Sequence, residues 1–468
     1  MSITIPFDNS YARLPAQLFS RLNPTPVKAP KLVAFNRPLA QELGIETDAS
    51  DDELARIFAG NDVPSGAEPL AQLYAGHQFG NWNPQLGDGR AILLGEAQGR
   101  DIQLKGSGPT PYSRNGDGRA WLGPVLREYV VSEAMQALGI PTTRALAAVE
   151  TGEEIYRETA LPGAIVTRVA SSHIRVGTFQ ILAARGDTEG LQALFEHAAD
   201  RHYPDAQSPL EFLNSVIAAQ AELIVKWLSV GFIHGVMNTD NCAISGETID
   251  YGPCAFMDAF HPMQVFSSID RRRRYAYGNQ PDIIVWNMAQ LATALIPLID
   301  DQERAVAEFT TAVHAMPAMI QRLWRERFAM KIGIANPVPE DEKLITDLMG
   351  LMGKQEADFT NSFRALSDGN ARDQFLDPKS FDSWEQNWKK RLESEDNPEY
   401  LMRSVNPSII PRNHQIEAMI TAAVKGDYAP FHRLSKAFAN PYDAPGAFID
   451  LTRPPKDEER VTATFCGT

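Results

Sequence analysis

Apolar residues recur at helical spacing in several long stretches of the chain. The clearest stretch starts at Ser208, which predicts an N-cap followed by Pro209 at the first helical position and Glu211 as the capping-box acid. Its apolar stripe continues to Gly231, which predicts a buried helix that delivers the next segment rigidly. Further helices are predicted over residues 123–139, 283–298 and 301–328.

Strand patterns lie before this long helix. Residues 91–95 and 101–105 predict two strands, and residues 142–169 predict short strands with turns at Gly152 and Gly163. The chain therefore begins β-rich and continues helix-rich, and the fold class we expect is α+β.

Composition narrows the class of protein. The 468 residues carry a formal net charge of −15, which argues against broad binding to nucleic acid through phosphate neutralisation. The run Arg271–Arg274 is the one basic exception. Such a run is most often a solvated face, and the alternative is a role in holding an anionic group near the site.

Targeting signals and cysteine frameworks are not evident. No basic start followed by an apolar stretch occurs at the N-terminus, and the most apolar helix carries Glu222 and Lys226, which argues against a membrane span. Three cysteines cannot form a disulfide framework, and no two have the spacing of zinc ligands. We therefore expect a cytoplasmic protein with reduced thiols.

Two Gly-Asp-Gly-Arg turns, at residues 87–90 and 116–119, suggest phosphate binding. Glycine lets backbone N–H groups approach a phosphate, and arginine adds a forked cationic donor. The first turn precedes a strand and then a second strand ending in Lys105, the order found in the small lobe of a protein kinase. Glu128 is the acid that we expect to pair with Lys105. The alternatives are a solvated edge strand for Lys105 and a helix-dipole acid for Glu128.

Polar side chains are concentrated between His234 and Asp250. The kinase signature H-R-D-x-x-x-x-N followed by D-F-G, laid on His234, places a metal-binding Asn at Asn241 and a metal-binding Asp at Asp250. Val236 stands where the kinase base would be. Asp240 is then the candidate general base, because successive residues of an extended chain face opposite sides. The alternative is an ordinary Asp-Asn turn.

Two further arginines suggest a second anion clamp. Arg168 closes an apolar strand and Arg175 follows shortly after it. Surface arginines are the alternative, and the sequence does not separate the two.

Four motifs give the chain a resemblance to the selenoprotein O family. They cover residues 74–80, 105–114, 234–241 and 250–253. The resemblance implies a protein-kinase-like bilobal fold and the transfer of AMP, or UMP, from the nucleoside triphosphate to Ser, Thr or Tyr hydroxyls of proteins, with Mg²⁺ or Mn²⁺. By motif match, the family's proton acceptor falls on Asp240 and its metal ligands on Asn241 and Asp250. Its nucleotide contacts fall on Gly87, Gly89, Arg90, Lys105, Asp117, Gly118, Arg168, Arg175 and Asp250.

The same resemblance implies a division of the chain. We expect an N-terminal extension over residues 1–75, a nucleotide-binding small lobe over 76–180, a helical large lobe over 181–440 and a tail over 441–468. The tail carries Cys466, where family members have cysteine or selenocysteine. The family's partner cysteine near the activation segment corresponds to Phe266 here, so redox control through that bridge is in doubt, and Cys254 is a substitute partner.

Two other functions remain open from the sequence. One is a metal-dependent kinase that transfers the γ-phosphoryl group, and the other is a non-catalytic pseudokinase that binds a nucleotide. All three readings predict a nucleotide site and no nucleic-acid or membrane partner. The oligomeric state is left open.

Overall fold

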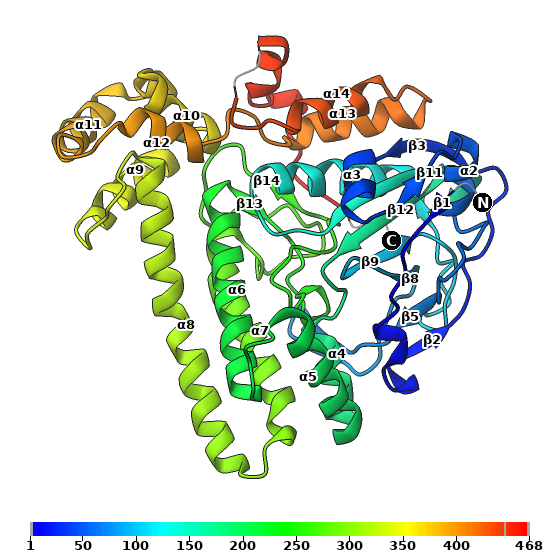
Figure 1. Ribbon diagram of the computed structural model, residues 1–468. Helices are drawn as coiled ribbons and strands as arrows, with labels where there is room; N and C mark the ends of the chain where they lie inside the picture. Colours follow the sequence, from blue (N-terminus) through cyan, green and yellow to red (C-terminus); the bar gives the residue numbers. More distant parts are fainter. Residues whose placement is uncertain (1–2, 444–445, 466–468) are drawn as a thin grey trace.

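The computed structural model describes residues 3–443 and 446–465, and its first part is built around one antiparallel sheet (Figure 1). The strand order of this sheet is β2-β5-β8-β9-β12-β11-β3, and β10 pairs with β12 off this path. The mixture of one large antiparallel sheet with many helices agrees with the expected α+β class. The strands are β2 (Phe19–Arg21), β3 (Lys31–Phe35), β5 (Leu70–Gln72), β8 (Ala91–Ala97), β9 (Arg100–Lys105), β10 (Ala120–Trp121), β11 (Arg144–Tyr156) and β12 (Ala160–Ala170).

The longest hairpin differs from the prediction of short strands. β11 and β12 run without interruption, and Gly152 and Gly163, predicted as turns, lie inside them. Gly152 has a φ of +69° and sits where the register shifts between Glu150 and Glu154. A glycine inside a strand often marks such a bulge, which the sequence pattern does not distinguish from a turn.

One helix covers the sheet beside these strands. α3 (Leu122–Ala137) confirms the helix predicted over residues 123–139, and it packs on β11 and β12. The helix begins at Leu122, so Glu128 lies in its second turn and faces the interior. The strands β8 and β9 are likewise confirmed, with Lys105 as the last residue of β9.

The second part of the molecule is helical. α6 (Pro209–Ser229) packs against α7 (Gln280–Leu295) and α8 (Gln302–Lys331), and α4 (Val176–Arg185) and α5 (Thr188–His202) lie between them and the sheet (Figure 1). At the start of α6, Ser208 Oγ accepts a hydrogen bond from the Glu211 N–H at 3.3 Å. The Glu211 carboxylate accepts from the Gln207 N–H, so only half of the predicted capping box forms.

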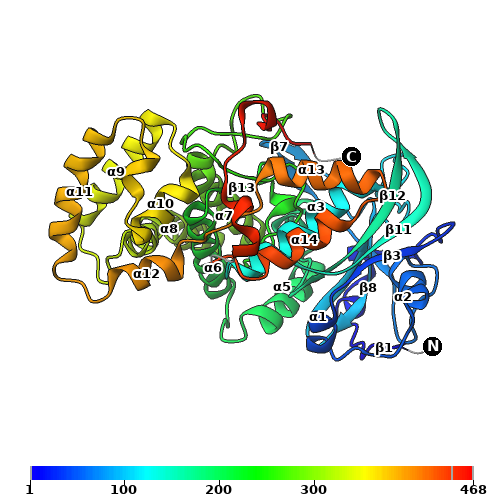
Figure 2. The ribbon, with the colours of Figure 1, turned by 90° about the horizontal axis from the view of Figure 1, so that it is seen from above.

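The last third of the chain leaves this bundle and then returns to the sheet. α9 (Asp341–Gln355), α10 (Phe359–Asp368), α11 (Pro378–Leu392) and α12 (Pro398–Val405) form a group at the far end of α8. α13 (Asn413–Val424) and α14 (Ala429–Phe438) then lie beside α3 (Figure 2). Among the described residues, none of the helices combines the length and apolarity that crossing a bilayer requires. The division of the chain at residues 75, 180 and 440 stays a prediction.

A buried arginine joins these parts. Arg412, 1% exposed in its side chain, lies 2.5 Å from Asp258 and 2.8 Å from Asp358. We expect Arg412→Met to lower the free energy of unfolding by about 3–5 kcal/mol, because two largely buried carboxylates lose their cation. Urea unfolding measures the change.

The matched control is Arg433→Met on α14. Arg433 pairs with Asp450 at 2.6 Å, but its side chain is 40% exposed. A solvent-screened pair of this kind contributes about 0–1 kcal/mol. Equal losses in the two variants would contradict the importance of burial at Arg412.

Candidate active site

The segment between His234 and Asp250 follows α6 and the short strand β13 (Phe232–Ile233). The buried His234 connects the two ends of this segment. The His234 Nε2–H donates to the Ile249 carbonyl oxygen at 2.8 Å, and its ring stacks on Trp227. Burial lowers the pKa of His234, so it stays neutral and fixes the start of this segment to its end.

Asp240 and Asn241 lie in a 3₁₀ turn, η3 (Thr239–Asn241), rather than in the extended chain that the sequence analysis assumed. Their side chains nevertheless separate. Asp240 Oδ2 accepts a hydrogen bond from Gln78 Nε2 at 3.0 Å, and Asn241 Nδ2 donates to the Val236 carbonyl oxygen at 2.9 Å. The two side chains thus have different partners, and the extended chain assumed for them was wrong.

A network of buried ion pairs surrounds Asp250. Lys105 Nζ lies 2.6 Å from Glu128 Oε2 and 2.7 Å from Asp250 Oδ1. Arg168 Nη1 lies 3.3 Å from Glu128 Oε1 and 2.6 Å from Asp250 Oδ1. The predicted pairing of Lys105 with Glu128 is confirmed, and the two basic side chains share both carboxylates.

Arg175 extends this network toward Asp240. Its Nη1 donates to the Asp240 carbonyl oxygen at 2.9 Å, and its guanidinium lies over the Tyr74 ring. Its Nη2 lies 3.8 Å from Asp88 Oδ1 and has no hydrogen-bond partner among the described residues. A buried cationic donor without a hydrogen-bond partner is suited to an anionic ligand.

The charged groups of the site affect one another's ionisation. The neighbouring Lys105, Arg168 and Arg175 lower the pKa of Asp250 well below its usual range, despite burial, which acts in the opposite direction. Burial raises the pKa of Asp240 to about 6. Asp250 is therefore a firmly ionised carboxylate, and Asp240 is a stronger base than an exposed aspartate while still ionised at pH 7.

A cleft of about 530 Å³ opens beside these residues. Ligand pockets commonly have volumes of about 300–1,000 Å³, so the cleft has the volume of a small-molecule site. All the predicted catalytic, nucleotide and metal residues line it, namely Gly87, Gly89, Arg90, Lys105, Asp117, Gly118, Arg168, Arg175, Asp240, Asn241 and Asp250.

The two Gly-Asp-Gly-Arg turns differ within this cleft. Around the first, a Cβ on Gly87 would lie 2.6 Å from the Tyr112 ring, so glycine lets the loop of Tyr112 close over the turn. In the second, Asp117 Oδ2 is 2.8 Å from Arg157 Nη1, and Arg119 donates to the Thr25 and Pro26 carbonyl oxygens. The second turn is thus already partly occupied by protein contacts.

The oxygen donors present fit a divalent ion held jointly with phosphates. The side-chain nitrogen of Asn241 donates to Val236, and no described residue donates to the side-chain oxygen, Oδ1. That oxygen is therefore available to a metal ion. Asp250 Oδ2 lies 3.5 Å from Arg175 Nη1. Among the described residues, no group of three or more His, Cys, Asp or Glu side chains could hold a metal. Mg²⁺ usually takes one or two protein oxygens and completes its shell with phosphates and water, so two ligands suffice.

Several lining residues were not singled out from the sequence as parts of the site. Gln78 contacts Asp240, and Tyr74 lies under Arg175. Both belong to residues 74–80, which the family resemblance includes but to which no chemistry was assigned. Arg157, which holds Asp117, carries no signal in the sequence.

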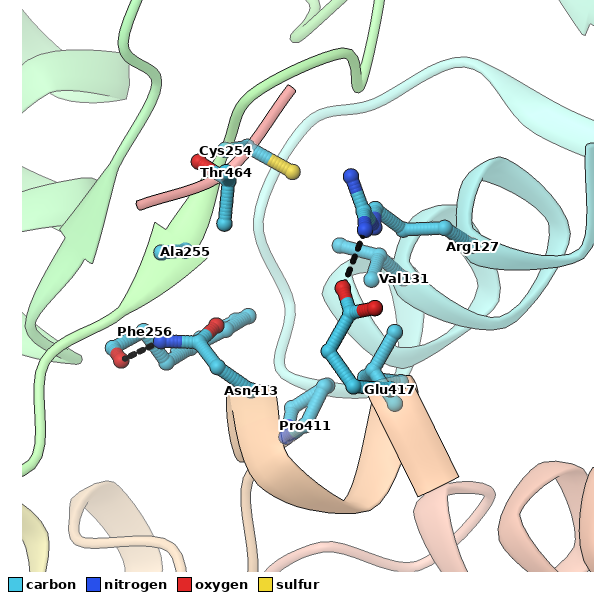
Figure 3. Close-up of a pocket in the computed structure, with 10 residues that line it drawn as sticks. Arg127, Val131, Cys254, Ala255, Phe256, Pro411, Asn413, Glu417 and Thr464 are labelled. Carbon is cyan, nitrogen blue, oxygen red and sulfur yellow. Dashed lines mark hydrogen bonds and ion pairs between the residues drawn. The ribbon is translucent and has the colours of Figure 1, made fainter. Parts of the chain in front are cut away.

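Thr464, near the end of the described chain, lies beside Cys254 (Figure 3). Thr464 Oγ1 donates to the Pro253 carbonyl oxygen at 2.6 Å, and Arg127 on α3 donates to the Gly252 carbonyl oxygen at 3.1 Å. Arg127 and Thr464 line a small pocket, and the buried Cys254 lines the same pocket. Cys466 lies outside the described residues. The tail therefore braces the chain that immediately follows Asp250.

Clustered cations, an ionised base and two candidate oxygen ligands in one cleft are features of an enzyme of the transferase class that works on a nucleotide. A sequence profile of the family described as protein adenylyltransferase SelO matches residues 2–439. The chain belongs to this family, as its motifs indicated.

Relatives agree over the full length. The chain is 64% identical to the protein nucleotidyltransferase YdiU of Ruegeria sp. (strain TM1040) and 64% identical to that of Ruegeria pomeroyi. It is 55% identical to the protein of the same name from Jannaschia sp.. Each comparison covers 100% of both chains. The enzyme class is thus that of the protein nucleotidyltransferases.

Proposed function

We propose that the protein transfers AMP from ATP to Ser, Thr or Tyr hydroxyls of target proteins, in the cytoplasm, and that its two parts are the lobes of a protein-kinase-like fold. One observation carries the choice of AMP. Besides the basic side chains around Asp250, Arg90 and Arg114 line the cleft, and these two have no ion-pair partner among the described residues. Arg90 and Arg114 suit the β- and γ-phosphates, and Lys105, Arg168 and Arg175 suit an α-phosphate beside Asp250.

In this arrangement the α-phosphate lies near Asp250. Lys105, Arg168 and Arg175 would exchange part of their contact with carboxylates for contact with phosphate oxygens. Asn241 and Asp250 would hold Mg²⁺ or Mn²⁺, which neutralises charge on the phosphates when bound. Glu128 would retain Lys105 in position.

Asp240 would act as the base. Its carboxylate takes the proton of the acceptor hydroxyl, the hydroxyl oxygen forms a bond to the α-phosphorus, and the bond to the bridging oxygen of the diphosphate breaks. Diphosphate leaves with the electron pair of that bond. Gln78 holds one carboxylate oxygen, and Oδ1, buried and without a partner among the described residues, is free to receive the proton.

Labelled nucleotides test this proposal. With Mg²⁺ or Mn²⁺ present, we expect protein-bound label from α-labelled ATP and none from γ-labelled ATP. Label from γ-labelled ATP alone would establish a kinase and overturn the proposal. Nucleotide binding with no label from either would establish a pseudokinase. A parallel reaction with α-labelled UTP measures the preference between AMP and UMP transfer.

A further inference from the structure

The run Arg271–Arg274 is not explained by the nucleotide cleft. The chain carries a net charge of −15, yet three consecutive exposed arginines, Arg271, Arg272 and Arg273, have no ion-pair or hydrogen-bond partner for their guanidinium groups among the described residues. None of the three lines the cleft. Their charge is therefore directed to solvent outside the nucleotide site.

The residues on either side of this run lie at the candidate active site. Ile269, which precedes it, lines the cleft and is 57% exposed. Tyr275, which follows it, donates its hydroxyl proton to Asn238 Oδ1 at 2.6 Å, two residues before Asp240. The run is therefore flanked by one residue that lines the cleft and by one that contacts the turn before Asp240.

The turn that presents the arginines is rigid. Asp270 is buried, and its carboxylate accepts hydrogen bonds from the Arg274 N–H at 2.9 Å and the Tyr275 N–H at 2.8 Å. Arg274 lies over the Trp286 ring and is thereby held apart from the other three. A preorganised display of charge reduces the entropy lost when a partner binds.

An exposed apolar rim accompanies the charge. Trp82 is 41% exposed and packs on His77, which in turn contacts Trp286. His77 neighbours Gln78, the residue that contacts Asp240. The exposed Trp82 is thus connected through His77 and Trp286 to Arg274, the last residue of the run.

We propose that Arg271, Arg272 and Arg273 form a docking surface for an acidic segment of the protein substrate that lies beside the modified hydroxyl. This inference rests on the proposed function, since it names the acceptor of that reaction. Unpaired guanidinium groups recognise carboxylates through forked hydrogen bonds, and charge complementarity guides encounter and register. The overall negative charge of the chain would keep such a partner away from the rest of the surface.

Direct binding tests the surface independently of catalysis. The probe is a fluorescent glutamate-rich peptide with one phenylalanine, which cannot accept AMP, measured by anisotropy. We expect the double variant Arg271→Glu/Arg272→Glu to bind it about tenfold more weakly than the unaltered protein, with ATP affinity unchanged. Rising ionic strength should weaken binding to the unaltered protein.

The matched control reverses two exposed charges elsewhere. Lys379→Glu/Lys390→Glu on α11, which lies on the opposite side of the molecule from β8 and β9 in Figure 1, should leave binding unchanged. Equal binding by the Arg271→Glu/Arg272→Glu variant and the unaltered protein would overturn the proposal. Loss of ATP affinity in that variant would also overturn it, by assigning the run to the nucleotide. Tighter binding of a single-stranded oligonucleotide than of the peptide would do the same.

A reactive peptide separates this inference from the proposed function. The glutamate-rich peptide with tyrosine in place of phenylalanine should receive label from α-labelled ATP faster than its lysine-rich counterpart. Binding of the phenylalanine peptide without any label on the tyrosine peptide would support the docking surface and count against nucleotidyl transfer.

Discussion

Replacing Asp240 by asparagine is expected to reduce the rate of AMP transfer by about 10²–10⁴-fold, the usual contribution of a positioned general base. Asparagine keeps the size of the side chain but cannot take the proton of the acceptor hydroxyl. Affinity for ATP should change little, because the Asp240 side chain contacts Gln78, whereas Lys105, Arg168 and Arg175 lie around Asp250. Incorporation of α-label and a thermal shift with ATP measure the two effects separately.

Asp282→Asn is the control for this substitution. Asp282 is an exposed acid in the first turn of α7, close in sequence to the basic run but outside the cleft. Its replacement should leave the transfer rate unchanged. A rate for Asp240→Asn within a few-fold of the unaltered protein would show that another group accepts the proton, and would remove Asp240 from the mechanism.

Local patterns predicted much of the framework that carries this site. The strands β8 and β9 and the helices α3 and α6 follow from alternation, helical spacing and caps, which depend on neighbours along the chain. The hairpin of β11 and β12 was divided wrongly, because Gly152 signals a bulge and a turn equally well. β2, β3 and β5 were not predicted, since their pairing depends on partners distant in sequence.

The residues of the site likewise divide into those that the sequence could connect and those that it could not. Lys105 and Glu128 could be paired from the sequence because the order of turn, strand and helix is that of a known nucleotide-binding lobe. Gln78 could not be connected to Asp240, because 162 positions separate them and only the folded chain brings them to 3.0 Å. That Arg175 Nη2 has no hydrogen-bond partner among the described residues likewise depends on burial and direction, which the composition does not contain.

Asp250→Asn is expected to reduce transfer by about 10³-fold or more, since it removes an anionic metal ligand at the reacting phosphates. The structure also predicts that the same substitution strengthens the binding of ATP when no metal is present. Asp250 holds Lys105 and Arg168 at 2.7 and 2.6 Å, so phosphates must compete with its carboxylate for those cations. Without metal, in EDTA, the variant should therefore bind ATP more tightly than the unaltered protein. Titration calorimetry with and without Mg²⁺ measures both affinities.

Glu128→Gln is the matched control, because Glu128 contacts the same Lys105 and Arg168 but is not a predicted metal ligand. It should release the two cations in a similar way and still bind ATP more tightly when Mg²⁺ is added. Asp250→Asn should lose that response to metal. If Mg²⁺ strengthened ATP binding to the Asp250→Asn variant as much as to the unaltered protein, Asp250 would be a partner of the basic side chains alone. The metal would then have to be held by other oxygens of the cleft.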